Sequence, residues 1–310
     1  MKISVVIPVY KSQETIQLLT QKLIDELSKI TNDYEIIYVN DDSPDNSWDI
    51  IQKLCKENPK IIGISLSRNF GQHPAILCGI KHSRGDAIIV MDCDLQEDPK
   101  YIPDLVKKLQ EGNDIVFTLK QKRAHAWWKN VMTKIFSFIY NYLIDDKRLL
   151  TSQQVGSFSI INRKVADAFL QFGDYQFHYL LVLRWLGFKQ SFIEIEHYER
   201  KAGKSSYNFK RLFEHALVAI VFQSDKLLRF NIYIGFIISF FSIIGIIYLL
   251  ISYFIHGYAK GWPSLFMLLL FTLGAVLFSL GIIGLYIGKM FEQVKSRPKF
   301  VIKELLNLEK

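Results

Sequence analysis

Two carboxylates and an amide follow one short apolar stretch of the chain. The run Ala87–Met91 predicts a buried strand, and Asp92, Asp94 and Gln96 follow it at alternate positions. Alternate side chains of an extended segment point the same way, so these three can present oxygen atoms to one point. Hard oxygen ligands of this kind suit Mg²⁺ or Mn²⁺ carrying a diphosphate. The alternative is an acidic turn that leads into a helix opened by Asp98-Pro99.

The elements around this motif alternate between apolar runs and amphipathic segments from residue 3 to residue 118. This alternation predicts a mostly parallel, Rossmann-like sheet with helices on both faces, whose ligands lie at the carboxyl ends of the strands. The polar loops expected at that edge are Pro8–Ser12, Asn40–Asp45, Arg68–Gln72 and Asp92–Asp98. The expected strands are Ile3–Pro8, Tyr34–Val39, Ile61–Leu66, Ala87–Met91 and Asp114–Thr118. The expected helices are Glu14–Ile30, Ser47–Glu57, Pro74–His82 and Pro103–Glu111.

Half of the residues in this chain of 310 are hydrophobic, and two uncharged stretches hold much of that excess. Ile232–Ile255 and Leu265–Gly288 each have 24 residues, and an α-helix needs roughly 20 to cross a bilayer. Neither stretch shows the polar face of a core helix, so we expect two transmembrane helices. Lys and Arg flank the outer ends of the pair, whereas the connection between them holds only Lys260. The positive-inside bias then puts both chain ends in the cytoplasm.

The net charge of +8 is explained by this membrane placement. Cationic side chains near membrane helices meet anionic lipid head groups. The chain has no zinc-finger spacing, arginine-rich repeat or aromatic RNA-reading motif, so nucleic acid is not an expected partner. Three widely spaced cysteines indicate reduced thiols in a cytosolic domain. The first apolar run is too short for a signal peptide.

The domain organisation follows from composition. A catalytic domain is expected over residues 1–208, a juxtamembrane amphipathic helix over 209–230, a two-helix hairpin over 231–290, and a cytoplasmic tail of short helix or coil over 291–310. Within the first domain, residues 125–144 are rich in Trp, Phe and Tyr and carry Lys129 and Lys134. That composition favours a helix lying in a membrane interface; the alternative is a core helix of the catalytic domain.

Five motifs in this order, with two terminal spans, resemble the inverting family 2 glycosyltransferases of GT-A fold. Within that family the chain is similar to the polyprenyl-phosphate glycosyltransferases, which include dolichol-phosphate mannosyltransferase and bacterial undecaprenyl-phosphate glucosyltransferases. The resemblance covers nearly the whole chain. The motifs are Val6–Tyr10, Asn40–Ser43, Ser67–Gly71, Met91–Gln96, and Gly281–Gly288 followed by Arg297-Pro298.

The resemblance implies roles at the donor site. A nucleotide sugar, with UDP first and GDP or dTDP as alternatives, would bind a pocket whose carboxylates accept hydrogen bonds from the base or ribose. Asp94 and Gln96 would be direct ligands of Mg²⁺ or Mn²⁺, with Asp92 nearer the sugar and ribose. The residues implied to line the donor pocket are Pro8, Tyr10, Asp41, Asp42, Arg68 and Asp92. Taken without the resemblance, Asp41 and Asp42 fit equally a turn before a helix.

The implied acceptor is undecaprenyl phosphate, a lipid phosphate monoester that is already an anionic nucleophile. It needs cations that hold two anionic reactants together more than it needs a general base. Arg123, Lys129, Arg200 and Lys204 are the candidates; the alternative for each is a solvated or lipid-facing charge. Many family members carry an acidic residue and an arginine where this chain has Gln154–Ser159. The missing acid leaves its role and the identity of the sugar open.

Three functions are weighed. The first is sugar transfer to undecaprenyl phosphate by a multi-pass protein of the bacterial plasma membrane, with its catalytic domain in the cytoplasm, for cell-envelope modification. The second keeps the chemistry but uses a lipid-linked saccharide or other glycolipid as acceptor. The third is a non-catalytic membrane scaffold that retains the fold. A two-helix hairpin is too small for a sugar channel, so a separate flippase and a downstream transferase are expected partners, and a homo-oligomer is left open.

Overall fold

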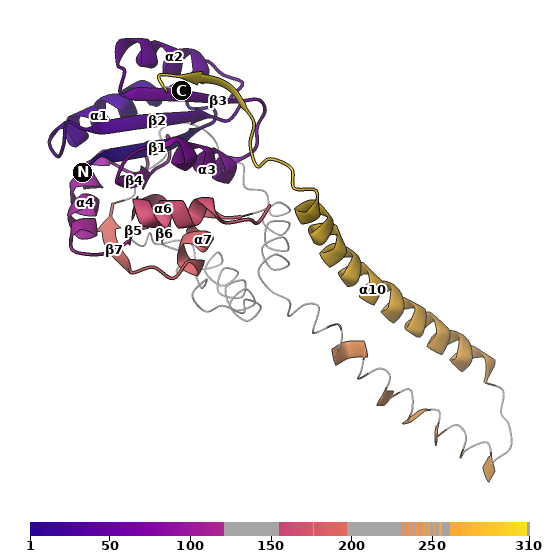
Figure 1. Ribbon diagram of the computed structural model, residues 1–310. Coiled ribbons are helices and arrows are strands. Elements are labelled where there is room, and N and C mark those ends of the chain that lie inside the picture. Colours follow the sequence, from indigo (N-terminus) through magenta and orange to yellow (C-terminus); the bar gives the residue numbers. More distant parts are fainter. Residues whose placement is uncertain are drawn as a thin grey trace. The chain divides into compact units, whose positions relative to one another are not determined.

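The computed structural model describes residues 1–120, 155–175, 177–196, parts of 231–255, and 261–308 (Figure 1). The chain divides into two compact units. The first consists of Met1–His125, Arg148–Ser206 and Arg297–Lys310, and the second of Ala126–Lys147 and Tyr207–Ser296. The first unit is the α/β part, and the second contains the long apolar helix near the C-terminus.

The first unit is built on one eight-stranded mixed sheet in the order β7-β5-β6-β4-β1-β2-β3-β8. Its apolar, β-branched runs are buried on both faces, as expected for central strands of such a sheet. The strands are β1 (Ile3–Val9), β2 (Tyr34–Asn40), β3 (Ile61–Leu66), β4 (Ala87–Val90), β5 (Ile115–Lys120), β6 (Val155–Asn162), β7 (Gln190–Ile195) and β8 (Ile302–Leu306).

Helices cover both faces of this sheet and enclose two apolar cores. On one face pack α1 (Ile16–Ser28), α2 (Ser47–Glu57) and α4 (Ile102–Gln110), the last preceded by the 3-10 turn η1 (Pro99–Tyr101). On the other face pack α3 (Gln72–His82), α6 (Arg163–Leu170) and α7 (Tyr179–Trp185). The expected strands and helices of residues 3–118 are therefore present, with ends shifted by at most two residues.

The expectation of a mostly parallel sheet needs a correction. β1, β2, β3 and β4 are parallel to one another. β6 lies between β4 and β5 and runs antiparallel to both, and β8 runs antiparallel to β3. The long segment between β5 and β6 allows β6 to enter the sheet beside β4. Sequence spacing does not reveal such a non-local pairing, because the direction of a strand depends on the path of its connection.

The C-terminal tail also differs from the expected short helix or coil. β8 pairs with β3, and the Ser67 N–H donates to the Val301 carbonyl at 2.9 Å. The Asn307 amide donates to the Ile61 carbonyl at 2.9 Å, and Glu304 accepts from Trp48 at 3.1 Å. The tail is thus an edge strand of this sheet. The side chains of β8 alternate between half-buried and exposed, because successive side chains of a strand point to opposite faces.

The second unit contains α10 (Trp262–Val294), which includes the expected span Leu265–Gly288. Among the described residues, one helix is long and apolar enough to cross a membrane, at Phe271–Val294, with a mean hydropathy of 2.0 and 6% of that stretch buried. In the same unit the Ser279 hydroxyl donates to the Asn231 side chain at 2.9 Å. Much of the other expected span, Ile232–Ile255, lies outside the described residues, as do the expected helices at 125–144 and 209–230.

Candidate functional site

The four polar loops predicted to meet at one edge of the sheet follow β1, β2, β3 and β4, which are parallel neighbours. Val9 is paired with Asn40 and Val6 with Val90, so the carboxyl ends of these strands share one edge. Each loop contains one residue with a positive φ: Lys11 (53°), Asp42 (51°), Gly71 (99°) or Leu95 (58°). Non-glycine residues rarely adopt this conformation, and it occurs mostly at functional sites and tight turns.

The loop after β4 divides its side chains between the core and the edge of the sheet. Met91, Cys93 and Leu95 are buried, whereas Asp92, Asp94 and Gln96 are half-buried. The Gln96 N–H donates to the Asp94 carboxylate at 3.1 Å. Cys93 is part of the apolar core, and burial raises the pKa of its thiol to about 12. The predicted alternation of these six residues is therefore present, although the loop is not a regular strand.

The side-chain oxygen atoms at this loop are hard ligands, the type that a divalent cation such as Mg²⁺ prefers. Among the residues that the structure describes, no group of three or more His, Cys, Asp or Glu side chains could by itself hold a metal ion. Two carboxylates and an amide are an incomplete ligand set, but Mg²⁺ commonly combines one or two carboxylates with substrate phosphates and waters. Asp94 and Gln96 would hold such an ion together with a bound diphosphate.

Asp92 is held by two neutral donors from other elements. The Gln72 amide, at the start of α3, donates to Asp92 Oδ1 at 2.6 Å, and the Ser157 hydroxyl of β6 donates to Oδ2 at 2.8 Å. The sequence predicts no site role for Gln72 or Ser157. Gln72 ends one of the four polar loops and Ser157 lies in the segment that lacks the family's acid, but no local pattern indicates their contact with Asp92.

The predicted pair Asp41 and Asp42 separates into two environments. Asp41 is 3% exposed, and its carboxylate accepts from the backbone N–H groups of Phe70 at 2.7 Å and Gly71 at 2.8 Å. Burial raises the pKa of the Asp41 carboxyl above its ordinary value, although those two N–H groups oppose the shift. Asp42 is exposed. Asp41 therefore anchors the loop after β3, and Asp42 is the carboxylate of the pair that faces solvent.

The remaining candidates for the nucleotide pocket lie on the same edge. Tyr10 is 47% exposed, and the backbone N–H of the next residue, Lys11, donates to the Ser43 hydroxyl at 2.7 Å, which ties the loops after β1 and β2 together. The Arg68 guanidinium lies 4.3 Å from the centre of the Phe70 ring. Pro8 is half-buried near the end of β1. The fold thus gathers residues from four separate loops into one region.

The predicted acceptor residues stay predictions. Arg123, Lys129, Arg200 and Lys204 lie outside the described residues, and so does Gln154.

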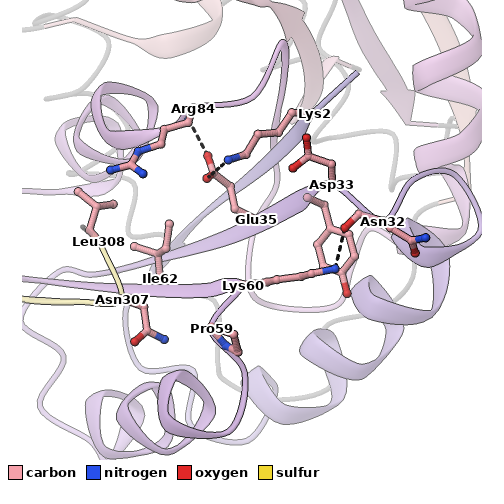
Figure 2. A pocket seen from close by; sticks show the side chains of 11 residues that line it. Lys2, Asn32, Asp33, Glu35, Pro59, Lys60, Ile62, Arg84, Asn307 and Leu308 are labelled. Atoms are coloured by element: carbon pink, nitrogen blue, oxygen red, sulfur yellow. Dashed lines mark hydrogen bonds and ion pairs between the residues drawn. The ribbon is translucent and has the colours of Figure 1, made fainter. Parts of the chain in front are cut away.

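A pocket of about 560 Å³ lies at the opposite, amino edge of the sheet (Figure 2). Its buried carboxylate, Glu35, is already paired within the protein. Glu35 accepts from Ser4 Oγ at 2.6 Å and from the Arg84 N–H at 2.6 Å, and it lies 3.2 Å from Lys2 Nζ. Lys60 Nζ donates to the Asn32 carbonyl at 2.6 Å. This pocket holds none of the five motifs, so its size does not make it the donor site.

Comparison with known proteins gives a consistent set of relatives. Residues 4–170 match the family model described as glycosyl transferase family 2. A prophage bactoprenol glucosyl transferase homolog from Escherichia coli K12 is 32% identical over 98% of this chain and 99% of its own length. The SfII prophage-derived bactoprenol glucosyl transferase of Shigella flexneri is 32% identical over 98% of both chains. An uncharacterized glycosyltransferase of Synechocystis, sll0501, is 33% identical over 99% of this chain and 96% of its own.

Solved structures give more distant likenesses. S. aureus TarS 1-349 in complex with UDP-GlcNAc has a TM-score of 0.48 at 15% identity, and the match covers 72% of this chain and 66% of that one. Glucosyl-3-phosphoglycerate synthase from Mycobacterium tuberculosis, in complex with Mn²⁺, UDP-glucose and phosphoglyceric acid, has a TM-score of 0.46 at 16% identity over 71% of this chain and 77% of that one.

Proposed function

Since this chain belongs to glycosyl transferase family 2 and is a glycosyltransferase, we propose that it transfers one sugar from a nucleotide-sugar donor to undecaprenyl phosphate, with inversion at the anomeric carbon. The observation that carries this proposal is the full-length similarity to two bactoprenol glucosyl transferases. Bactoprenol is another name for undecaprenol. The match extends through the apolar C-terminal part of the chain as well as the α/β unit, so it supports a membrane-embedded acceptor as well as the reaction class.

The donor would bind at the carboxyl edge of the sheet. Tyr10 and Asp42 are exposed there and could contact the base and ribose. Asp92 would lie nearer the sugar. Asp94 and Gln96 would hold a divalent cation on the diphosphate. When bound, such a cation would neutralise charge that develops on the nucleoside diphosphate leaving group. Asp41 would act indirectly, by fixing the loop that carries Phe70 and Gly71.

The acceptor phosphate would act as nucleophile without help from a base. One of its oxygens forms a bond to the anomeric carbon as the bond from that carbon to the diphosphate oxygen breaks, and the nucleoside diphosphate leaves with the electron pair. A phosphate monoester carries close to two negative charges near neutral pH, so cations must bring the two anions together. Arg123, Arg200 and Lys204 are proposed for this role. The absence of an acid in the segment Gln154–Ser159 is compatible with such a reaction.

Product analysis tests this proposal. Purified full-length protein is incubated with one of two acceptors, undecaprenyl phosphate or a lipid-linked saccharide, and with UDP-glucose, GDP-mannose or dTDP-glucose in separate reactions. The lipid product is identified by mass spectrometry. A monoglycosylated undecaprenyl phosphate, whose sugar is released by mild acid, supports the proposal. A new glycosidic bond on a lipid-linked saccharide, with no transfer to undecaprenyl phosphate, would move the assignment to the glycolipid acceptor. No transfer to either acceptor from any donor would overturn both.

Membrane placement is tested by labelling. The proposed location is the bacterial plasma membrane, with the α/β unit in the cytoplasm and the connection before α10 outside. A single cysteine replacing Gly261 should react with an impermeant thiol reagent added to intact cells, whereas one replacing Lys310 should not. Native Cys55, Cys78 and Cys93 are buried, so background labelling should be low. The reverse pattern would put the catalytic unit away from cytosolic nucleotide sugars and end the proposal.

A further inference from the structure

Asp92 lies where three elements of the fold converge, and each of its carboxylate oxygens accepts a hydrogen bond from a different element. β4 and β6 are paired antiparallel up to Val90 and Ser159. Continuing that pairing by two residues along both strands brings Asp92 opposite Ser157, whose hydroxyl donates at 2.8 Å. Gln72 reaches the other oxygen, at 2.6 Å, from the first turn of α3.

The loop that ends at Gln72 is itself held in place by a fourth part of the fold, Asp41, which follows β2. Gly71 has a φ of 99°, a conformation that L-residues rarely adopt, and it is the N-cap of α3. The N–H groups of Phe70 and Gly71 donate to the buried carboxylate of Asp41 at 2.7 and 2.8 Å. The Asn69 side chain also donates to the Asp41 carbonyl, at 3.2 Å. The loop that ends at Gln72 is therefore held to the end of β2, and its geometry is set before any ligand arrives.

A carboxylate with one fixed donor on each oxygen has little rotational freedom. Both of these donors are neutral, so they orient Asp92 without themselves cancelling its charge. A lysine or arginine at either position would instead pair with the carboxylate and weaken its attraction for other groups. The two hydrogen bonds also limit rotation of the Asp92 side chain toward Asp94.

We propose that Gln72 and Ser157 are positioning residues that hold Asp92 in one rotamer toward the donor sugar, with Asp41 anchoring the loop that presents Gln72. This inference rests on the proposed function, because it assigns to the same site the residues that set its geometry. It assigns no substrate contact to Gln72 or Ser157 themselves. Asp92 is then oriented by the protein rather than by a bound cation.

Kinetic measurements on the full-length protein in detergent test the proposal, with UDP-glucose and undecaprenyl phosphate as probes. Each substitution removes one hydrogen bond to a charged group. Because of the free energy that such a bond contributes, Ser157→Ala and Gln72→Met should each lower kcat/KM for the donor by about tenfold. Ser157→Thr, which keeps the hydroxyl, should restore most of the loss. In an Asp92→Asn background the same two substitutions should have less than a threefold further effect, because their shared partner is already changed.

Two matched controls separate positioning from folding. Gln52→Met removes the same kind of amide from α2, where Gln52 donates to Glu304 at 3.1 Å far from the four loops. Ser83→Ala removes a buried hydroxyl just after the C-terminal end of α3, which donates to the Ile80 carbonyl at 2.8 Å. Both should leave kcat/KM within about twofold of the wild type while lowering the unfolding temperature at least as much as Ser157→Ala. Equal activity losses in controls and test variants would overturn the proposal, as would full additivity with Asp92→Asn.

Crystal structures of the wild type and of the Gln72→Met/Ser157→Ala variant give a readout that does not depend on activity. Asp92 should occupy one rotamer in the wild type and more than one, or another, in the variant. An unchanged rotamer would overturn the inference even if sugar transfer is confirmed. If the wild type transfers no sugar, the proposed function fails on the product assay, while the rotamer comparison still decides whether Gln72 and Ser157 position Asp92.

Discussion

The two edges of the same sheet are built in opposite ways. At the amino edge, the buried Glu35 carboxylate meets Lys2 and two further donors, so that its charge is compensated within the protein. At the carboxyl edge, each of four loops has a residue in the left-handed region, and carboxylates are oriented by neutral donors. A buried carboxylate paired with a lysine contributes to the fold, whereas a carboxylate oriented by hydrogen bonds from neutral side chains has a geometry suited to binding a ligand. The difference indicates which edge is structural and which is functional.

The largest effect should come from Asp94→Asn at the carboxyl edge. If Asp94 helps to hold a cation on the leaving diphosphate, its loss should lower kcat by roughly a thousandfold or more. The unfolding temperature should stay close to that of the wild type, because Asp94 is half-buried in a loop. Excess chelator should reproduce the loss in the wild type. Full activity of the variant, or of the wild type in chelator, would contradict metal-dependent transfer.

Glu35→Gln, at the amino edge, should have the opposite effect: it should lower stability and leave activity unchanged. Glu35 is 5% exposed and its partner Lys2 has a side chain 30% exposed, so the pair is partly screened. Loss of the charge should lower the free energy of unfolding by about 2 kcal/mol, less than for a fully buried pair, with kcat/KM unchanged. Chemical denaturation and steady-state kinetics measure the two quantities.

Glu111→Gln is the matched control for this prediction. It breaks an ion pair with Lys108 on the exposed face of α4, where both side chains are well solvated. We expect no measurable shift of the unfolding midpoint from that substitution. A large activity loss in Glu35→Gln without a stability change would remove the distinction between the two edges.

The histidine pair beside the carboxyl-edge loops predicts a pH dependence of stability. His73, in the first turn of α3, lies with its ring centroid 4.1 Å from that of His178. Burial, with a smaller contribution from His178, lowers the pKa of His73 from 6.5 to about 3. As the pH falls, the unfolded chain therefore binds a proton on the His73 ring that the folded chain does not bind. The contribution of the neutral His73 ring to the free energy of unfolding is complete above pH 6.5, and it is lost as the pH falls from 6.5 toward 3.

That loss should have a slope of up to about 1.4 kcal/mol per pH unit from this one group. The free energy of unfolding, measured by denaturant titration between pH 7 and pH 4.5, should fall less steeply in His73→Gln than in the wild type. Parallel curves for the wild type and His73→Gln would contradict the burial of a neutral ring.

The smallest effect concerns backbone strain at the carboxyl edge. Lys11 is exposed and has a φ of 53°, which costs energy for any residue with a Cβ. Lys11→Gly should therefore raise the free energy of unfolding, by up to about 1 kcal/mol after the entropy of glycine in the unfolded chain is counted. Lys56→Gly in helix α2 is the control of opposite sign and should destabilise by about 1 kcal/mol. Equal destabilisation by both would show that the Lys11 conformation is not strained.

Local pattern determined the first half of the fold closely. The strand Ile61–Leu66 and the helix Ser47–Glu57 were predicted to the residue, because apolar runs and 3.6-residue periodicity are properties of short segments. The same patterns put the four loops at one edge, since neighbouring parallel strands end together. The family resemblance, which the full-length relatives confirm, also required only the order of short motifs along the chain.

Only the tertiary structure decided how these residues act on one another. Sequence could not show that β6 runs antiparallel beside β4, or that the tail is a strand beside β3, because both pairings join residues distant in the chain. It could not separate Asp41 from Asp42, which are adjacent in sequence but differ in burial. Residue type determined which atoms could bind a nucleotide sugar. The long-range contacts of Gln72 and Ser157 determined where Asp92 points, because a hydrogen bond depends on position in space and not on spacing along the chain.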